Sequence, residues 1–126
     1  MEQSFSDSDS MADFQKPTSS KNLNDQLIVL IVDDNDFELY LAKKTLKEFN
    51  SKLNIVTCNA SNEAVKIARH SHFDLIITDV KMGKGNLDGF ELTEMLRKSG
   101  NQSFIFIHTS GNESENLQLA KQAGAN

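Results

Sequence analysis

Near residue 27 the chain changes from a polar stretch without periodicity to a regular alternation of two hydrophobic patterns. One pattern is a short continuous apolar run, which is too short for a helix and is typical of a strand buried in a parallel sheet. The other has apolar residues at spacings of three and four, as on the buried face of an amphipathic helix. Together they predict strands at residues 27–32, 53–58, 73–80 and 104–108.

A helix is expected after each strand, and glycines mark the ends of the last two helices, at Gly100 and Gly124. This fourfold strand–helix alternation predicts an α/β fold with a parallel sheet, right-handed crossovers and helices on both faces. The expected helices are, in chain order, one with Leu39, Ala42, Leu46 and Phe49 inward; one capped by Ser61 and running to Arg69; one capped by Asp88 with Glu91, with Leu92, Met95 and Leu96 inward; and one from Glu113 to Ala123 with Leu117 and Ala120 inward.

The N-terminal stretch differs from the rest of the chain in composition. Residues 1–26 are rich in Ser, Asp, Asn and Gln and contain the only proline, Pro17. Such a segment cannot bury enough apolar surface to offset the entropy lost on ordering. We therefore expect a disordered arm at residues 1–26 and one folded domain at residues 27–126.

Composition and charge narrow the classes of function. A net charge of −5 disfavours a nucleic-acid surface, and no apolar run approaches the ~18 residues that cross a membrane. Cys58 is the only cysteine, which rules out an internal disulfide and favours a reducing cytoplasm. The three histidines, His70, His72 and His108, lack metal-ligand spacing with it, so a zinc site is not expected. We expect a cytoplasmic protein without nucleic-acid or membrane partners.

Polar side chains follow three of the predicted strands: Asp33 with Asp34, then Asp79, then Thr109 with Ser110. The carboxyl ends of parallel strands meet at one edge of the sheet, where ligands bind in open α/β folds. Three carboxylates at that edge would repel one another unless a cation neutralised them. Mg²⁺ prefers oxygen ligands and often shares its shell with a phosphate. The sequence therefore predicts a Mg²⁺ site.

Chemistry at this edge is expected to centre on Asp79, at the end of the strand with the apolar run Leu75–Ile77. A carboxylate can attack a phosphoryl donor and form an aspartyl phosphate. A metal ion would neutralise charge on the transferred group, and the Thr109 hydroxyl could donate a hydrogen bond to a phosphoryl oxygen.

These motifs resemble those of the receiver domain of two-component response regulators, over about residues 27–126. The residues that carry the resemblance are Ile31-Val32-Asp33-Asp34-Asn35, Asp74-Leu75-Ile76-Ile77-Thr78-Asp79-Val80, Leu87-Asp88-Gly89-Phe90-Glu91-Leu92, Thr109-Ser110 and Ala123-Gly124-Ala125. The resemblance implies a flavodoxin-like, doubly wound parallel sheet with the strand order 2-1-3-4-5.

The resemblance also implies the roles of the site residues. Asp79 would be the phosphoacceptor, and Asp34, Asp79 and the backbone carbonyl of Lys81 would bind Mg²⁺ directly, with Asp33 acting through water. Thr109 would be the switch hydroxyl. A histidine kinase or a histidine phosphotransfer protein would supply the phosphoryl group. The domain would thus be a phosphorylated signalling module rather than an enzyme, apart from slow autodephosphorylation.

The sequence departs from the family pattern in three places. Gly83 stands where a proline usually follows the methionine, in a loop that is longer than usual, and His108 occupies a usually apolar position. The family's fifth strand, last helix, switch aromatic and phosphoryl-contacting lysine would all lie beyond Asn126, so we expect (βα)4 of a complete (βα)5. No lysine of this chain matches the catalytic lysine, since Lys81 and Lys84 lie in a different loop.

Two other functions remain open on the sequence. Without the catalytic lysine, the chain could be a pseudo-receiver that binds partners independently of phosphorylation. Asp34-Asn35-Asp36 after the first strand also imitates the Asp-x-Asp motif of haloacid-dehalogenase-like phosphatases. The absence of a threonine two positions after that motif, and the second acidic strand end at Asp79, favour the receiver.

Overall fold

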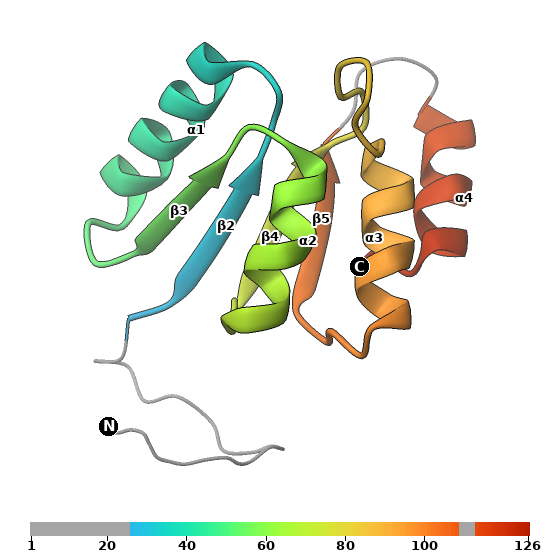
Figure 1. Cartoon of the computed structure of the whole chain (residues 1–126). Helices are drawn as coiled ribbons and strands as arrows, with labels where there is room; N and C mark the ends of the chain where they lie inside the picture. Colours follow the sequence, from blue (N-terminus) through green and yellow to red (C-terminus); the bar gives the residue numbers. More distant parts are fainter. Residues whose placement is uncertain (1–25, 109–112) are drawn as a thin grey trace.

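The computed structural model describes residues 26–108 and 113–126, and Figure 1 shows their arrangement. Four parallel strands form one sheet in the spatial order β3-β2-β4-β5. The sheet confirms the predicted flavodoxin-like fold of (βα)4 type. The elements are β2 (Ile28–Val32), α1 (Asp36–Phe49), β3 (Asn54–Cys58), α2 (Ser61–His70), β4 (Leu75–Asp79), α3 (Gly89–Lys98), β5 (Phe104–His108) and α4 (Glu113–Ala123). The arm expected at residues 1–26 lies, apart from Gln26, outside the described residues.

Helices cover both faces of the sheet, and α1 lies on the face opposite to α2 and α3 (Figure 1). Alternate residues of β2 supply both hydrophobic cores, because successive side chains of a strand point to opposite faces. Leu30 and Val32 pack with α2 and α3, whereas Val29 and Ile31 pack with Leu39 of α1. β2 is therefore buried on both sides, as its continuous apolar run predicts.

Three apolar residues expected to face inward are exposed instead. Phe49, at the last position of α1, is 88 % exposed, and Met95 and Leu117 also lie on outer helix surfaces. Spacing of three and four defines a stripe along the helix axis, and the residues that are buried lie at the centre of that stripe. On α3 this centre is Leu92, Thr93 and Leu96, all fully buried.

Strand β5 is the sheet edge among the described residues, with Phe104 and Phe106 half-exposed. One position on this edge is paired. The backbone N–H of Asn126 donates to the Ile105 carbonyl (3.0 Å), and the Ile105 N–H donates to Asn126 Oδ1 (2.9 Å). Asn126 is held there by the Arg97 guanidinium, which also donates to the Gly124 and Ser103 carbonyls.

No helix in the described part of the chain is long and apolar enough to span a membrane.

Candidate functional site

Acidic residues meet at the carboxyl edge of the two central strands. Val32 pairs with Thr78, so Asp33, the residue after β2, lies beside Asp79, the last residue of β4. Asp34 follows Asp33 directly in the chain. Thr109, predicted to be the switch hydroxyl, lies outside the described residues. The parallel register thus brings Asp33 and Asp79 together as the sequence predicts.

The pKa of Asp33 responds to both burial and the neighbouring like charges. Burial raises the pKa of the Asp33 carboxyl, and the charges of Asp79, Asp34 and Glu38 raise that pKa further, against a lowering by the hydrogen bond from the Asn35 N–H. Within the described residues, no Lys, Arg or His forms an ion pair with Asp33, Asp34 or Asp79. In this part of the chain, the acidic cluster therefore carries negative charge that no cationic side chain compensates.

Backbone donors fix two of the acids in place. Asp33 Oδ1 accepts a hydrogen bond from the Asn35 N–H (2.9 Å), and Asp79 Oδ1 accepts one from the Val80 N–H (2.8 Å). Asn35 in turn caps α1, because its Oδ1 accepts from the Glu38 N–H (2.9 Å). Among residues 26–108 and 113–126, no hydrogen bond is formed to the second oxygen of either carboxylate, which leaves that oxygen open to other contacts.

Glycines allow the β4–α3 loop, residues 80–88, to lie close to these acids. A Cβ on Gly89 would collide with the Asp79 carbonyl, and one on Gly83 would lie 3.0 Å from Asp34 Oδ2. Gly89 opens α3, whose N-cap Asp88 forms the predicted capping box with Glu91. The loop begins at Val80, whose carbonyl accepts from the Gly89 N–H (2.8 Å), so its two ends are tied together.

The acidic cluster offers a small set of oxygen donors for a metal ion. Among the described residues, no three His, Cys, Asp or Glu side chains lie close enough together to hold one. Mg²⁺ is usually bound by one or two carboxylates, with its other positions taken by water, carbonyl or phosphate oxygens. The juxtaposed carboxylates at the ends of β2 and β4 and the loop at Gly83 fit that smaller requirement.

His108 also borders the site. It is the register partner of Asp79, and its carbonyl accepts from the Val80 N–H (3.1 Å). A groove of about 390 Å³ between α1 and the sheet is lined by both residues and by Asp33. Its floor is apolar, with Ile77 and Phe106 among the lining side chains.

Two features near the site were not apparent from the sequence. Phe37 and Tyr40 stack on the exposed surface of α1, with ring centroids 6.5 Å apart, just after the acidic strand end. Ser61, expected to cap α2, is instead its first helical residue, and Ala60 is the N-cap. The acceptor for the Ser61 N–H is the side chain of Asn86, from the β4–α3 loop. The spacing of three between Phe37 and Tyr40 was a sequence signal for the aromatic pair. The contact between Ser61 and Asn86 had no such signal, because it joins residues far apart in the chain.

Comparison with known proteins identifies the family. The model of the response regulator receiver domain matches residues 29–126. The chain belongs to this family.

Relatives and solved structures agree with this assignment. The chain is 31 % identical to the sensor protein EvgS of Escherichia coli K12 over 82 % of its own length, but it spans only 8 % of that protein. The chemotaxis protein CheY4 of Vibrio cholerae has 28 % identity and a TM-score of 0.72, covering 81 % of this chain and 83 % of CheY4. A chain in the co-crystal structure of the Saccharomyces cerevisiae histidine phosphotransfer protein Ypd1 with the receiver domain of Ssk1 has 23 % identity and a TM-score of 0.70, covering 80 % of this receiver and 75 % of that chain.

Proposed function

We propose that this receiver domain accepts a phosphoryl group on Asp79 in a two-component or phosphorelay pathway. The observation that carries the proposal is the parallel register of β2 and β4, which sets Asp79 beside Asp33 at the carboxyl edge of the sheet. Family membership supports the same role. An oxygen of Asp79 attacks the phosphorus atom, and the bond from phosphorus to the donor's imidazole nitrogen breaks, giving an aspartyl phosphate.

Mg²⁺ is the proposed cofactor. Asp34, Asp79 and the Lys81 carbonyl would hold it, with Asp33 acting through a bound water. Bound there, the ion supplies positive charge that stabilises the oxygens of the transferred group. The charge of the acidic cluster supports this proposal: burial and, to a smaller extent, the charges of Asp79, Asp34 and Glu38 raise the pKa of Asp33, and a bound cation would offset both effects.

The phosphorylated domain is proposed to signal through Thr109, by a hydrogen bond from its hydroxyl to a phosphoryl oxygen. Phosphorylation adds a multiply charged group with strong acceptor oxygens. The surface around β5 and α4 would then differ between the two states, and partners would bind one state better than the other.

A histidine kinase or a histidine phosphotransfer protein is the proposed phosphodonor. The Ssk1 receiver domain was solved together with the phosphotransfer protein Ypd1. In this chain, the exposed Phe37–Tyr40 pair lies next to the acidic strand end and offers an apolar contact for such a donor. Aromatic side chains are enriched among the residues that dominate binding energy at interfaces.

Labelling with a small-molecule phosphodonor in the presence of Mg²⁺ tests the phosphoacceptor. Asp79→Asn should abolish formation of a hydroxylamine-sensitive acyl phosphate while leaving the circular dichroism spectrum unchanged. Asp88→Asn is the matched control, because asparagine also serves as an N-cap, and this variant should label like the wild type. Equal labelling of Asp79→Asn and wild type, or mapping of the phosphate to Asp36 or Asp88, would refute the assignment.

The same experiment separates the other two functions. A wild-type chain that binds Mg²⁺ yet acquires no label would be a pseudo-receiver, which binds partners without phosphorylation. Continuous release of inorganic phosphate with turnover would indicate a phosphatase. Asp34→Ala gives an independent test of the metal site, since Mg²⁺ affinity should fall by about tenfold or more when a direct ligand is removed. An unchanged titration would exclude Asp34 as a ligand.

A further inference from the structure

The side chain of Asn86 connects the β4–α3 loop to the start of α2. Asn86 Oδ1 accepts hydrogen bonds from the Ser61 N–H (3.1 Å) and from the Ser61 hydroxyl (3.3 Å). The N-cap of α2 is Ala60, which has no side-chain acceptor. Since the first N–H groups of a helix need outside acceptors, Asn86 supplies from a distant loop the cap that Ala60 lacks. Ser61 is completely buried at this contact.

A second contact strengthens the connection. The Asn62 side chain donates from Nδ2 to the Gly85 carbonyl (3.2 Å). Gly83 to Asn86 form a turn closed by the Asn86 N–H and the Gly83 carbonyl (3.1 Å), with Gly85 at φ +88°, where glycine is favoured. The tip of the loop is therefore a closed turn fixed to α2 at two adjacent residues.

The same turn also reaches the acidic cluster on its other side. Gly83 lies against Asp34, close enough that an added Cβ would be 3.0 Å from Asp34 Oδ2. Lys81, whose carbonyl is a proposed metal ligand, is two residues before Gly83. The turn thus spans the distance between the N-terminus of α2 and the proposed metal site.

We propose that Asn86 is a positioning residue for the metal and phosphoryl site, acting by fixing the β4–α3 loop to Ser61. This inference rests on the proposed function. The Asn86 contact orders the loop before the cation binds. The free energy of cation binding therefore does not include the entropy lost on ordering the loop. Without the Asn86 contact, that ordering would accompany binding and weaken it.

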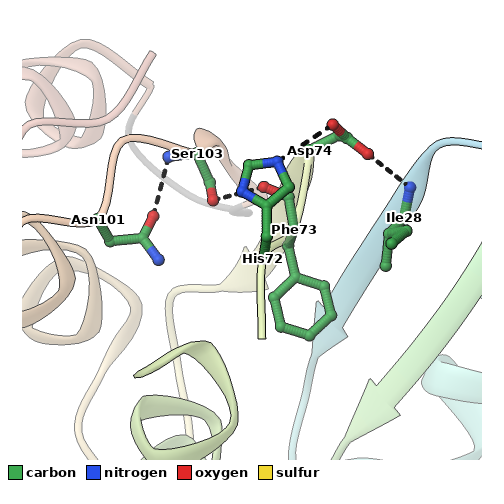
Figure 2. Close-up of polar contacts among 6 residues, drawn as sticks. All are labelled: Ile28, His72, Phe73, Asp74, Asn101 and Ser103. Atoms are coloured by element: carbon green, nitrogen blue, oxygen red, sulfur yellow. Dashed lines mark hydrogen bonds and ion pairs between the residues drawn. The ribbon is translucent and has the colours of Figure 1, made fainter. Parts of the chain in front are cut away.

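A different result is expected if Asn86 serves only as a structural cap of α2. Removal of its side chain would then lower the free energy of unfolding and leave Mg²⁺ affinity unchanged. Asn101 provides the matched comparison. Like Asn86 it is half-buried, and its Oδ1 accepts from a backbone N–H, that of Ser103 (2.9 Å), but at the opposite edge of the sheet (Figure 2).

The test has two measurements on the full chain. Isothermal titration calorimetry with Mg²⁺ gives the affinity of each variant, and urea unfolding gives its stability. Asn86→Ala should weaken Mg²⁺ affinity about tenfold, the lower end of the range for residues that orient metal ligands. Asn86→Asp keeps the acceptor oxygen and should restore most of the affinity. Lys84→Gln, on the same exposed turn, controls for the change in net charge that Asn86→Asp introduces. Asn101→Ala should bind Mg²⁺ like the wild type even if it is equally destabilised.

The Mg²⁺ affinities of the variants distinguish a positioning role of Asn86 from a purely structural one. Equal Mg²⁺ affinity of Asn86→Ala and Asn101→Ala would overturn the inference while leaving the proposed function intact. A wild-type chain that binds no Mg²⁺ would overturn both. If Asn86→Ala does not fold, Asn86→Gln replaces it, because glutamine keeps the carboxamide but moves its oxygen one methylene further away; wild-type affinity in that variant would contradict the positioning role.

Discussion

The two ends of strand β4 carry the same residue type in opposite circumstances. Asp74 precedes the strand, where its Oδ2 accepts from the Ile28 N–H (2.8 Å) and its Oδ1 lies 3.4 Å from His72 Nε2 (Figure 2). Asp79 ends the strand among other acids, where burial, and then the charges of Asp79, Asp34 and Glu38, raise the pKa of neighbouring Asp33. The first carboxylate joins two strands, and the second adds to a concentration of like charge.

The surroundings of the two ends differ in the same way. At the amino edge, the Ser103 hydroxyl donates to the Phe73 carbonyl (2.6 Å), and Arg97 donates to the carbonyls of Asn101 and Ser103. Buried polar groups are thereby satisfied, which is what stability requires. At the carboxyl edge, charge is left uncompensated in the described residues. One end of the sheet favours folding, and the other retains the unfavourable charge that a ligand can relieve.

Loss of Arg97 should give the largest effect at the amino edge. Arg97→Ala removes a guanidinium that binds three carbonyls and Asn126 Oδ1, and should lower the free energy of unfolding by about 3 kcal/mol. Arg97→Lys should recover only part of this, since an ammonium lacks the planar fork of donors. Urea unfolding measures both variants. Full recovery by lysine would show that charge alone matters at this position.

The comparison of the two aspartates can be made directly. Asp74→Ala leaves the Ile28 N–H without its carboxylate acceptor and should cost about 1–3 kcal/mol of stability. Asp79→Ala should leave stability within about 1 kcal/mol of wild type or raise it, because the Val80 N–H keeps the His108 carbonyl as acceptor and repulsion is relieved. Thermal unfolding of the metal-free proteins tests this order, and a more destabilised Asp79→Ala would reverse the assignment of roles.

The smallest expected effect is a gain of stability at the carboxyl edge. Because the folded-state pKa of Asp33 is raised above its ordinary value of 3.8, its ionisation disfavours the folded state. The protonated Asp33 carboxyl makes its full contribution to the stability of the folded state below pH 3.8. That contribution is lost as the pH rises through the elevated pKa of Asp33. Asp33→Asn should therefore exceed wild type in metal-free stability at pH 7, by less than about 1 kcal/mol, and the two should converge near pH 3. Equal stability at both pH values would contradict the raised pKa of Asp33.

Much of this arrangement was predictable because it depends on local patterns. Continuous apolar runs such as that of β2 identified buried parallel strands, and the register of those strands then placed Asp33 beside Asp79. The capping box of Asp88 and Glu91 is also local and was predicted correctly.

The features that were missed depend on tertiary contacts. Ser61 and Asn86 are 25 residues apart, and nothing in either segment indicates that one caps the other. Phe49 has helical spacing with Leu39 and Leu46, yet the surface available at the sheet decides which of them is buried. Asn126 likewise shows no sign in the sequence of its pairing with Ile105.

The pairing of Asn126 has a consequence for assembly. In a parallel edge strand, alternate residues direct their N–H and carbonyl groups outward and can template the addition of a foreign strand. Ile105 is such a residue, and the backbone and carboxamide of Asn126 already bind both of its groups. A side chain here imitates a peptide unit, so among the described residues Ile105 offers no open template for a foreign strand, and the hydrogen bond from Arg97 to Asn126 Oδ1 holds that side chain in place.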